Sequence, residues 1–154
     1  MQNRRAAREA VLKSIYAVEV GGNTTQDVTR NILKKALGVE PGAVRFAEKL
    51  LLTTVDHAQE HDLLIQRHIN NWEVTRLAII DKLILRMTLS EFLYFDDVPT
   101  KVSINEGIEL AKKYSTRKSG NFVNGILDAV LTELKREGKI QKKGRGLIES
   151  SASE

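Results

Sequence analysis

The chain has 154 residues, of which 42% are hydrophobic and 29% charged, with a formal net charge of +4 and no cysteine. This length predicts one domain with a core that is stable without cross-links, and the lack of cysteine excludes disulfides, thiolate metal ligands and a cysteine nucleophile. No apolar run reaches the roughly 18 residues of a membrane-spanning helix, and no secretory signal follows Met1. We therefore expect a cytoplasmic protein without a membrane segment, whose basic clusters indicate its partners.

The first predicted helix runs from about Asn3, a suitable N-cap, to Val20, and the Gly21–Gly22 pair ends it. Its core-facing stripe consists of Val11, Leu12, Ile15 and Val18. Three arginines lie on the same arc or at its edge, namely Arg4, Arg5 and Arg8. Because the first turn of a helix carries the positive end of its dipole, arginines there predict contact with anions or acidic partners.

Two more helices are predicted in the first half of the chain. One begins near Thr25 and ends before Gly38, and the next begins at Pro41, which suits the first turn of a helix. The apolar residues then keep helical spacing as far as Ile69, until the Asn70–Asn71 pair breaks the pattern. This spacing predicts either one long helix or two helices separated by a kink.

The most apolar stretch, residues 72–95, predicts the central helix of the core, and it leaves open a short first segment before Asp81, with Asp81 as an internal cap. A break at residues 96–99 precedes a helix over Thr100–Tyr114. The segment STRKSG then forms a basic loop that leads into a last helix over Ser119–Glu137.

Residues 139–154 are first basic and then rich in serine, with little to bury, so we expect a disordered tail. The folded domain should therefore span residues 1–138. Because no alternating strand pattern of useful length occurs, the sequence predicts an all-α fold, a compact bundle of six or seven helices.

One motif points toward an enzyme. His57, Glu60 and His61 fit the H-x-x-E-H pattern of inverted zinc peptidases, and His68 falls on the same face if the helix continues. Five-residue patterns of common residues recur by chance, so polar residues beside a core stripe are the favoured interpretation. Neither a Gly-rich phosphate loop nor a G-x-S-x-G motif is found. We therefore expect no metal, no cofactor and no catalysis.

The basic residues form three clusters, the first of which is the arginine group of the first helix. The other two are Lys112, Lys113, Arg117 and Lys118 before the last helix, and Lys135, Arg136, Lys139, Lys142, Lys143 and Arg145 after its core-facing part. We interpret the third cluster as a solubilising tail. The first two indicate phosphate binding, because guanidinium groups bind phosphate oxygens through two parallel hydrogen bonds.

Phe122 stands one turn into the last helix, beside the basic loop. A helix N-terminus attracts phosphate, and an exposed aromatic ring can stack on an unpaired base. The helical pattern alone nevertheless favours core packing for Phe122. Gly125 should cost the same helix about 1 kcal/mol relative to alanine, which we explain by close approach of another backbone.

The run VPTKVSINEGIELAKKYSTRKSGNFVNGILD resembles the signature of the NusB family of bacterial transcription antitermination factors. The arginine-rich start and the stretch DKLILRMTLSEF are similar too, so that the resemblance covers about residues 3–137. It implies seven helices in two helical subdomains. It also implies a function without catalysis: binding of the single-stranded boxA element of nascent RNA together with the ribosomal protein NusE. The pair would act on the transcription elongation complex and support ribosomal RNA synthesis.

The resemblance implies roles for particular residues. RNA contacts fall on Arg4, Arg5, Arg8, Lys101, Lys118 and Phe122, and the face toward NusE carries Tyr16, Val20 and Asp81. Two residues depart from the family pattern. Asn121 replaces a frequent lysine, which removes one phosphate contact, and Gly107 replaces the usual alanine, which should weaken its helix slightly.

Other functions stay open from the sequence. NusB-like domains also occur fused to RNA methyltransferases, so the chain could be a stand-alone RNA-targeting module. It could equally be a protein-interaction bundle, including a homodimer that covers its RNA surface. The zinc hydrolase is the third and least favoured alternative.

Overall fold

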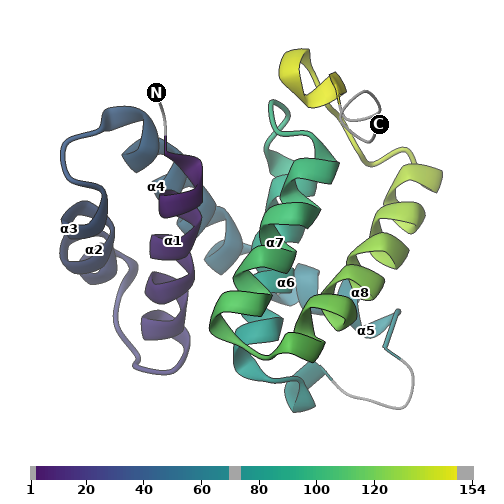
Figure 1. Cartoon of the computed structure of the whole chain (residues 1–154), viewed down its shortest axis with the longest axis horizontal. Helices are drawn as coiled ribbons and strands as arrows, with labels where there is room; N and C mark the ends of the chain where they lie inside the picture. Colours follow the sequence, from purple (N-terminus) through teal and green to yellow (C-terminus); the bar gives the residue numbers. More distant parts are fainter. Residues whose placement is uncertain (1–2, 70–73, 149–154) are drawn as a thin grey trace. The chain divides into compact units, whose positions relative to one another are not determined.

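The computed structural model describes residues 3–69 and 74–148, and the chain divides into two compact units, residues 1–56 and 57–154 (Figure 1). Every regular element in these described residues is helical, which confirms the all-α class. The two units agree with the two helical subdomains that the resemblance implies. No helix within the described residues has the length and apolar character needed to cross a membrane.

In the first unit, α1 (Arg4–Glu19) packs against α4 (Pro41–Asp56). Three short elements connect them: α2 (Thr25–Val28), the π-helical η1 (Thr29–Leu33) and α3 (Lys34–Leu37). The predicted N-cap is confirmed, since Asn3 Oδ1 accepts a hydrogen bond from the Ala6 amide at 3.0 Å. Gly38 ends α3 with a φ of 63°, in the left-handed region that glycine adopts most readily.

The long apolar pattern after Pro41 proves to be two helices. Helix α4 ends at Asp56, and α5 (Ala58–Gln66) begins directly after His57, whose φ of −110° and ψ of 20° are not helical. The division between the two units falls at the same point. A single residue therefore separates elements that belong to different cores.

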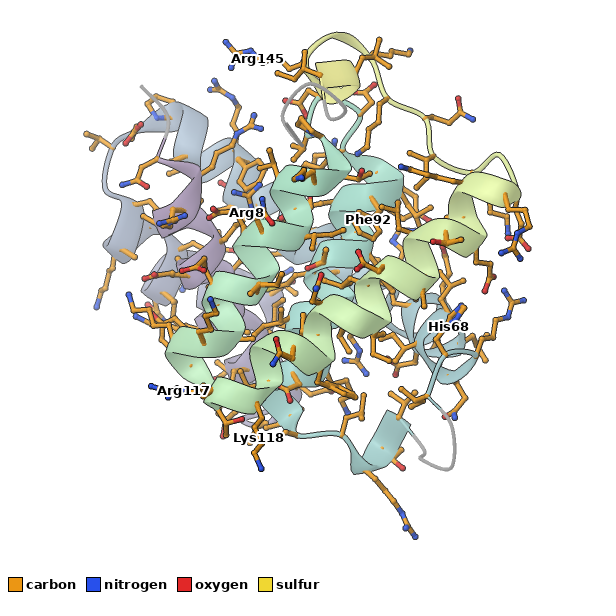
Figure 2. The ribbon with its side chains drawn as sticks, turned by 45° about the vertical axis from the view of Figure 1, so that its right-hand side comes forward. Arg8, His68, Phe92, Arg117, Lys118 and Arg145 are labelled. Carbon is orange, nitrogen blue, oxygen red and sulfur yellow. The ribbon has the colours of Figure 1, made fainter. Side chains whose placement is uncertain are left out.

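In the second unit, α6 (Ile79–Tyr94) is the central helix and contacts α5, α7 (Thr100–Tyr114) and α8 (Arg117–Arg136). It is buried along the whole run from Leu83 to Phe92, and Figure 2 shows Phe92 enclosed among these helices. A 3-10 turn, η2 (Val74–Arg76), precedes it. The apolar stretch thus forms the core helix that the sequence predicts.

Two local predictions are wrong in this unit. The N-cap of α6 is Ala78, so Asp81 lies in the first turn of the helix instead of capping it. The STRKSG segment is mostly helical, because the Thr116 hydroxyl accepts a hydrogen bond from the Ser119 amide and starts α8 at Arg117.

The C-terminal segment is structured as far as the structure describes it. Residues 139–148 lie within the predicted disordered tail, yet they include a 3-10 turn, η3 (Gly144–Ile148). The Lys142 ammonium group donates hydrogen bonds to main-chain oxygens at the end of α6. Residues 149–154 lie outside the described residues, and the boundary at residue 138 stays a prediction.

Candidate nucleic-acid interface

The three arginines of α1 have different surroundings. The Arg4 and Arg8 guanidinium groups lie over the Phe46 ring of α4, 4.5 and 5.1 Å from its centroid. Arg8 is only 4% exposed, whereas Arg5 is exposed to solvent. An arginine can stack on an aromatic face because its guanidinium is planar and weakly hydrated. The arginines on the apolar arc therefore contribute to packing, and Arg5 is the most accessible cation of the three.

The start of α8 gathers cations and one aromatic ring on the surface. Arg117 and Lys118 occupy the first turn and extend into solvent (Figure 2). Phe122 is 37% exposed and lies one turn after Lys118 on the same face. The core packing that the helical pattern favours for Phe122 is therefore wrong. We call Arg117, Lys118 and Phe122 the α8 patch.

Gly125 continues this face by one more turn. The prediction that another backbone packs closely against this glycine is also wrong. A Cβ atom at Gly125 would meet no atom of the described residues within 4 Å, so no other backbone approaches it. The glycine is exposed and leaves bare helix backbone beside Phe122. A flat ligand can thus approach α8 closely at this point.

Lys101 does not join the α8 patch. It lines a cleft between α7 and α8, whose α8 wall includes Asn124 and Asp128. At 100° per residue this wall lies on a different flank of α8 from Phe122. The C-terminal segment completes the cleft, and sequence reasoning missed that contribution.

The residues assigned to the partner face also differ from one another. Tyr16 and Val20, at the end of α1 in the first unit, are 41% and 55% exposed. Asp81, in the second unit, is 7% exposed, and its Oδ2 accepts a hydrogen bond from the Ser119 hydroxyl at 2.9 Å. Its Oδ1 is buried and has no hydrogen-bond partner among the described residues. A buried carboxylate oxygen of this kind is costly unless a donor reaches it.

The H-x-x-E-H residues have structural partners. His61 is fully buried and shares a hydrogen bond of 2.9 Å with the Ser90 hydroxyl, and burial lowers its pKa from 6.5 to about 4. The His57 ring stacks on Tyr94, whose hydroxyl donates to the Glu60 carboxylate.

His68 belongs to a separate cluster. Its Nε2 donates to Glu133 Oε1 at 2.6 Å, and this hydrogen bond lowers the pKa of the Glu133 carboxyl. Arg67 pairs with the same carboxylate. Within the described residues no three histidine or carboxylate side chains are grouped so as to hold a metal ion. These histidines act in packing and ion pairing.

Within the described residues, the fold and these surfaces define an all-α protein with exposed cations and exposed aromatic rings near its helix ends. Comparison with known proteins identifies the family. The profile described as NusB family matches residues 5–132. The chain belongs to the NusB family.

Individual relatives agree with this assignment. The transcription antitermination protein NusB of Salinibacter ruber is 44% identical over 148 residues, covering 96% of this chain and 92% of the relative. The solved structure of T. maritima NusB matches with a TM-score of 0.78 and 33% identity, over 86% of this chain and 94% of that one. A crystal structure of the antitermination factors NusB and NusE in complex with dsRNA matches with a TM-score of 0.77 and 25% identity, over 84% and 96%.

Proposed function

We propose that this protein is a non-catalytic transcription antitermination factor that binds boxA-type single-stranded RNA together with NusE. It would act in the cytoplasm on the transcription elongation complex and support ribosomal RNA synthesis. The observation that carries this proposal is the similarity, over most of both chains, to the NusB component of a solved assembly with NusE and dsRNA. The curated antitermination protein at 44% identity supports the same role.

The exposed cations and the exposed ring supply the chemistry for RNA. Arg5 and Arg4 offer guanidinium groups to phosphates from the first unit, and Lys118 does so from the second. The cations in the first turn of α8 lie at the positive end of the helix dipole, which repels them. A phosphate bound there would offset this repulsion. Phe122 supplies a stacking surface for an unpaired base. The buried Arg8 supports Phe46 and is a positioning residue in this proposal.

One exposed surface supports a protein partner. Tyr16 and Val20 expose apolar surface at the end of α1, which a partner would cover. We assign this surface to NusE. Asp81 is assigned to NusE by the resemblance alone, because its unpaired Oδ1 is buried. A second copy of this chain is the alternative occupant, and light scattering with and without RNA distinguishes the two.

A titration tests the function directly. We expect the protein to bind a boxA-type single strand more tightly than a scrambled strand of equal length, and NusE to increase that affinity. A duplex of the same sequence forms a third arm, since the similar NusB–NusE assembly contains dsRNA. Equal affinity for boxA and scrambled RNA, with and without NusE, would leave only a general RNA-targeting or protein-interaction module.

Replacing Arg4 and Arg5 with alanine should weaken RNA binding roughly tenfold at moderate salt, because two charge-assisted contacts are lost. The slope of log affinity against log salt should fall by about 1.4, at ~0.7 for each phosphate contact with a single strand. Both Arg4 and Arg8 contact Phe46, but Arg8 stays in place because it is buried, whereas Arg4 is only half-buried.

The matched control for this experiment removes Lys34 and Lys35. These exposed cations of α3 belong to the same unit and give the same loss of charge. Binding is measured by fluorescence anisotropy at four salt concentrations, and circular dichroism checks the helix content of each variant. An equal change in slope for both double variants would show that net charge, and not the α1 arginines, governs binding.

A further inference from the structure

The cleft between α7 and α8 arises because the two helices diverge. Near the turn that joins them they are close, since a Cβ atom at Gly120 would lie 3.3 Å from Lys112 Cγ. Toward the start of α7 and the end of α8 the ribbons separate (Figure 1). There a cleft of about 860 Å³ opens, with Ile104 of α7 and Leu131 of α8 on its walls. Its size lies within the range of small-molecule sites in proteins.

The C-terminal segment forms a fixed third wall of this cleft. The Lys142 ammonium group donates to the Glu91 and Phe95 carbonyl oxygens at 2.9 and 2.6 Å. The Lys143 amide donates to the Asp96 carbonyl oxygen at 2.9 Å. Gly146 lies so close to this oxygen that any side chain there would clash. The segment is therefore held by main-chain groups at the end of α6.

The lining of the cleft combines three kinds of group. Its cations are Lys101, Lys135 and Lys142, its side-chain amides are Asn105, Asn124 and Gln141, and Asp128 is its one carboxylate among the described residues. The Lys101 side chain makes no hydrogen bond or ion pair within the part of the chain that the structure describes. The excess of cations favours an anionic ligand, and the amides can both donate and accept hydrogen bonds.

We propose that this cleft binds one unstacked nucleotide of the RNA strand that the protein holds. The inference rests on the proposed function and adds a subsite to it. Lys101 donates to the flanking phosphate, the apolar walls contact the faces of the base, and Asn105 and Asn124 pair with its edge. The main chain of an acidic peptide would also pair with these amides. We favour the nucleotide because the proposed function already places RNA on this protein, and the outcomes below include a protein ligand.

A scan with abasic RNA tests the subsite. A single abasic residue is placed at each position of the bound strand, and affinities are measured for the full-length protein and for N105A/N124A. In the unchanged protein, an abasic residue at the RNA position that occupies the cleft should lower the affinity roughly tenfold, as expected for one lost base-edge pairing. The same abasic residue should cost N105A/N124A almost nothing, while positions that depend on Phe122 keep their full effect.

The control variant for the scan is Q26A/N31A, which removes two exposed amides from the first unit and should behave like the unchanged protein. Thermal unfolding checks the fold of each variant, and K101M serves as a second probe at the rim of the cleft. An RNA with 5-iodouracil at the sensitive position should cross-link to a peptide that contains residues 139–148.

The outcomes separate this inference from the proposed function. If the unchanged protein binds no RNA, both fail. If it binds boxA RNA but every abasic position has the same effect in N105A/N124A as in the unchanged protein, the subsite alone is wrong. A loss of NusE binding by N105A/N124A with intact RNA binding would assign the cleft to a protein ligand and would also contradict the subsite.

Discussion

Replacing Phe122 with alanine should lower the affinity for boxA-type RNA by about 1–3 kcal/mol, the usual contribution of a stacked base. The ring is 37% exposed at the start of α8 and lies beside Lys118 and the bare backbone of Gly125. Stacking is a contact between ring faces, so the salt dependence of binding should hardly change. Fluorescence anisotropy at two salt concentrations measures both quantities.

Two controls make this experiment specific. Phe122→Trp keeps a stacking surface and should retain most of the affinity. Val102→Ala removes apolar surface from a side chain of nearly equal exposure, 36%, elsewhere in the same unit, and should have no effect on binding. If Phe122→Ala binds RNA as tightly as the unchanged protein, the α8 patch is not a base-stacking surface.

Acidification from pH 7 to pH 4 should remove about 3 kcal/mol of folding stability through His61 alone. Burial lowers the pKa of His61 to about 4 in the folded protein, against 6.5 in the unfolded chain. The unfolded state therefore takes up a proton first as the pH falls below 6.5, and the folded state becomes less stable. Above pH 6.5 both states carry neutral imidazole, so the contribution of His61 is complete there.

Urea unfolding at pH 7, 6, 5 and 4 measures this effect. His61→Gln should show a shallower loss of stability than the unchanged protein between pH 6 and 4. Carboxylates such as Glu133, whose pKa is lowered in the fold, contribute to the acid loss in both proteins and cancel in the comparison. His57→Gln, at a half-buried residue beside Tyr94, should show a smaller change of the same sign, because the charge of His57 lowers the His61 pKa less than burial does. If the free energy of unfolding falls equally with pH in the unchanged protein and in His61→Gln, the loss of stability does not come from His61.

Helix periodicity was a sufficient guide wherever one helix serves one core. The bounds of α7, Thr100–Tyr114, are those that the apolar spacing and the preceding proline predict. The break at His57 could not be predicted in this way, because the apolar residues on both sides keep the same spacing although they enter different cores. Helix α8 begins two residues earlier than predicted for a local reason: Thr116 caps it from within a segment whose composition is typical of a loop.

The candidate surfaces were harder to predict than the helices. Apolar spacing placed Phe122 in the core, because a pattern of hydrophobicity cannot separate a buried ring from one that serves a ligand. The role of Arg8 depends on Phe46, which approaches it only through the packing of α1 on α4. The resemblance to the NusB family supplied the RNA surface, and its residues still require the experiments above.

The C-terminal segment has no sequence signal for its position, because its bonds go to main-chain oxygens. This arrangement has a consequence for the order of events during biosynthesis. Lys142 leaves the ribosome 51 residues after Glu91, whose carbonyl oxygen it binds. Nascent chains fold domain by domain from the N-terminal end, so residues 1–56 can fold early, whereas the end of α6 gains the hydrogen bonds from Lys142 only after that residue has been synthesised.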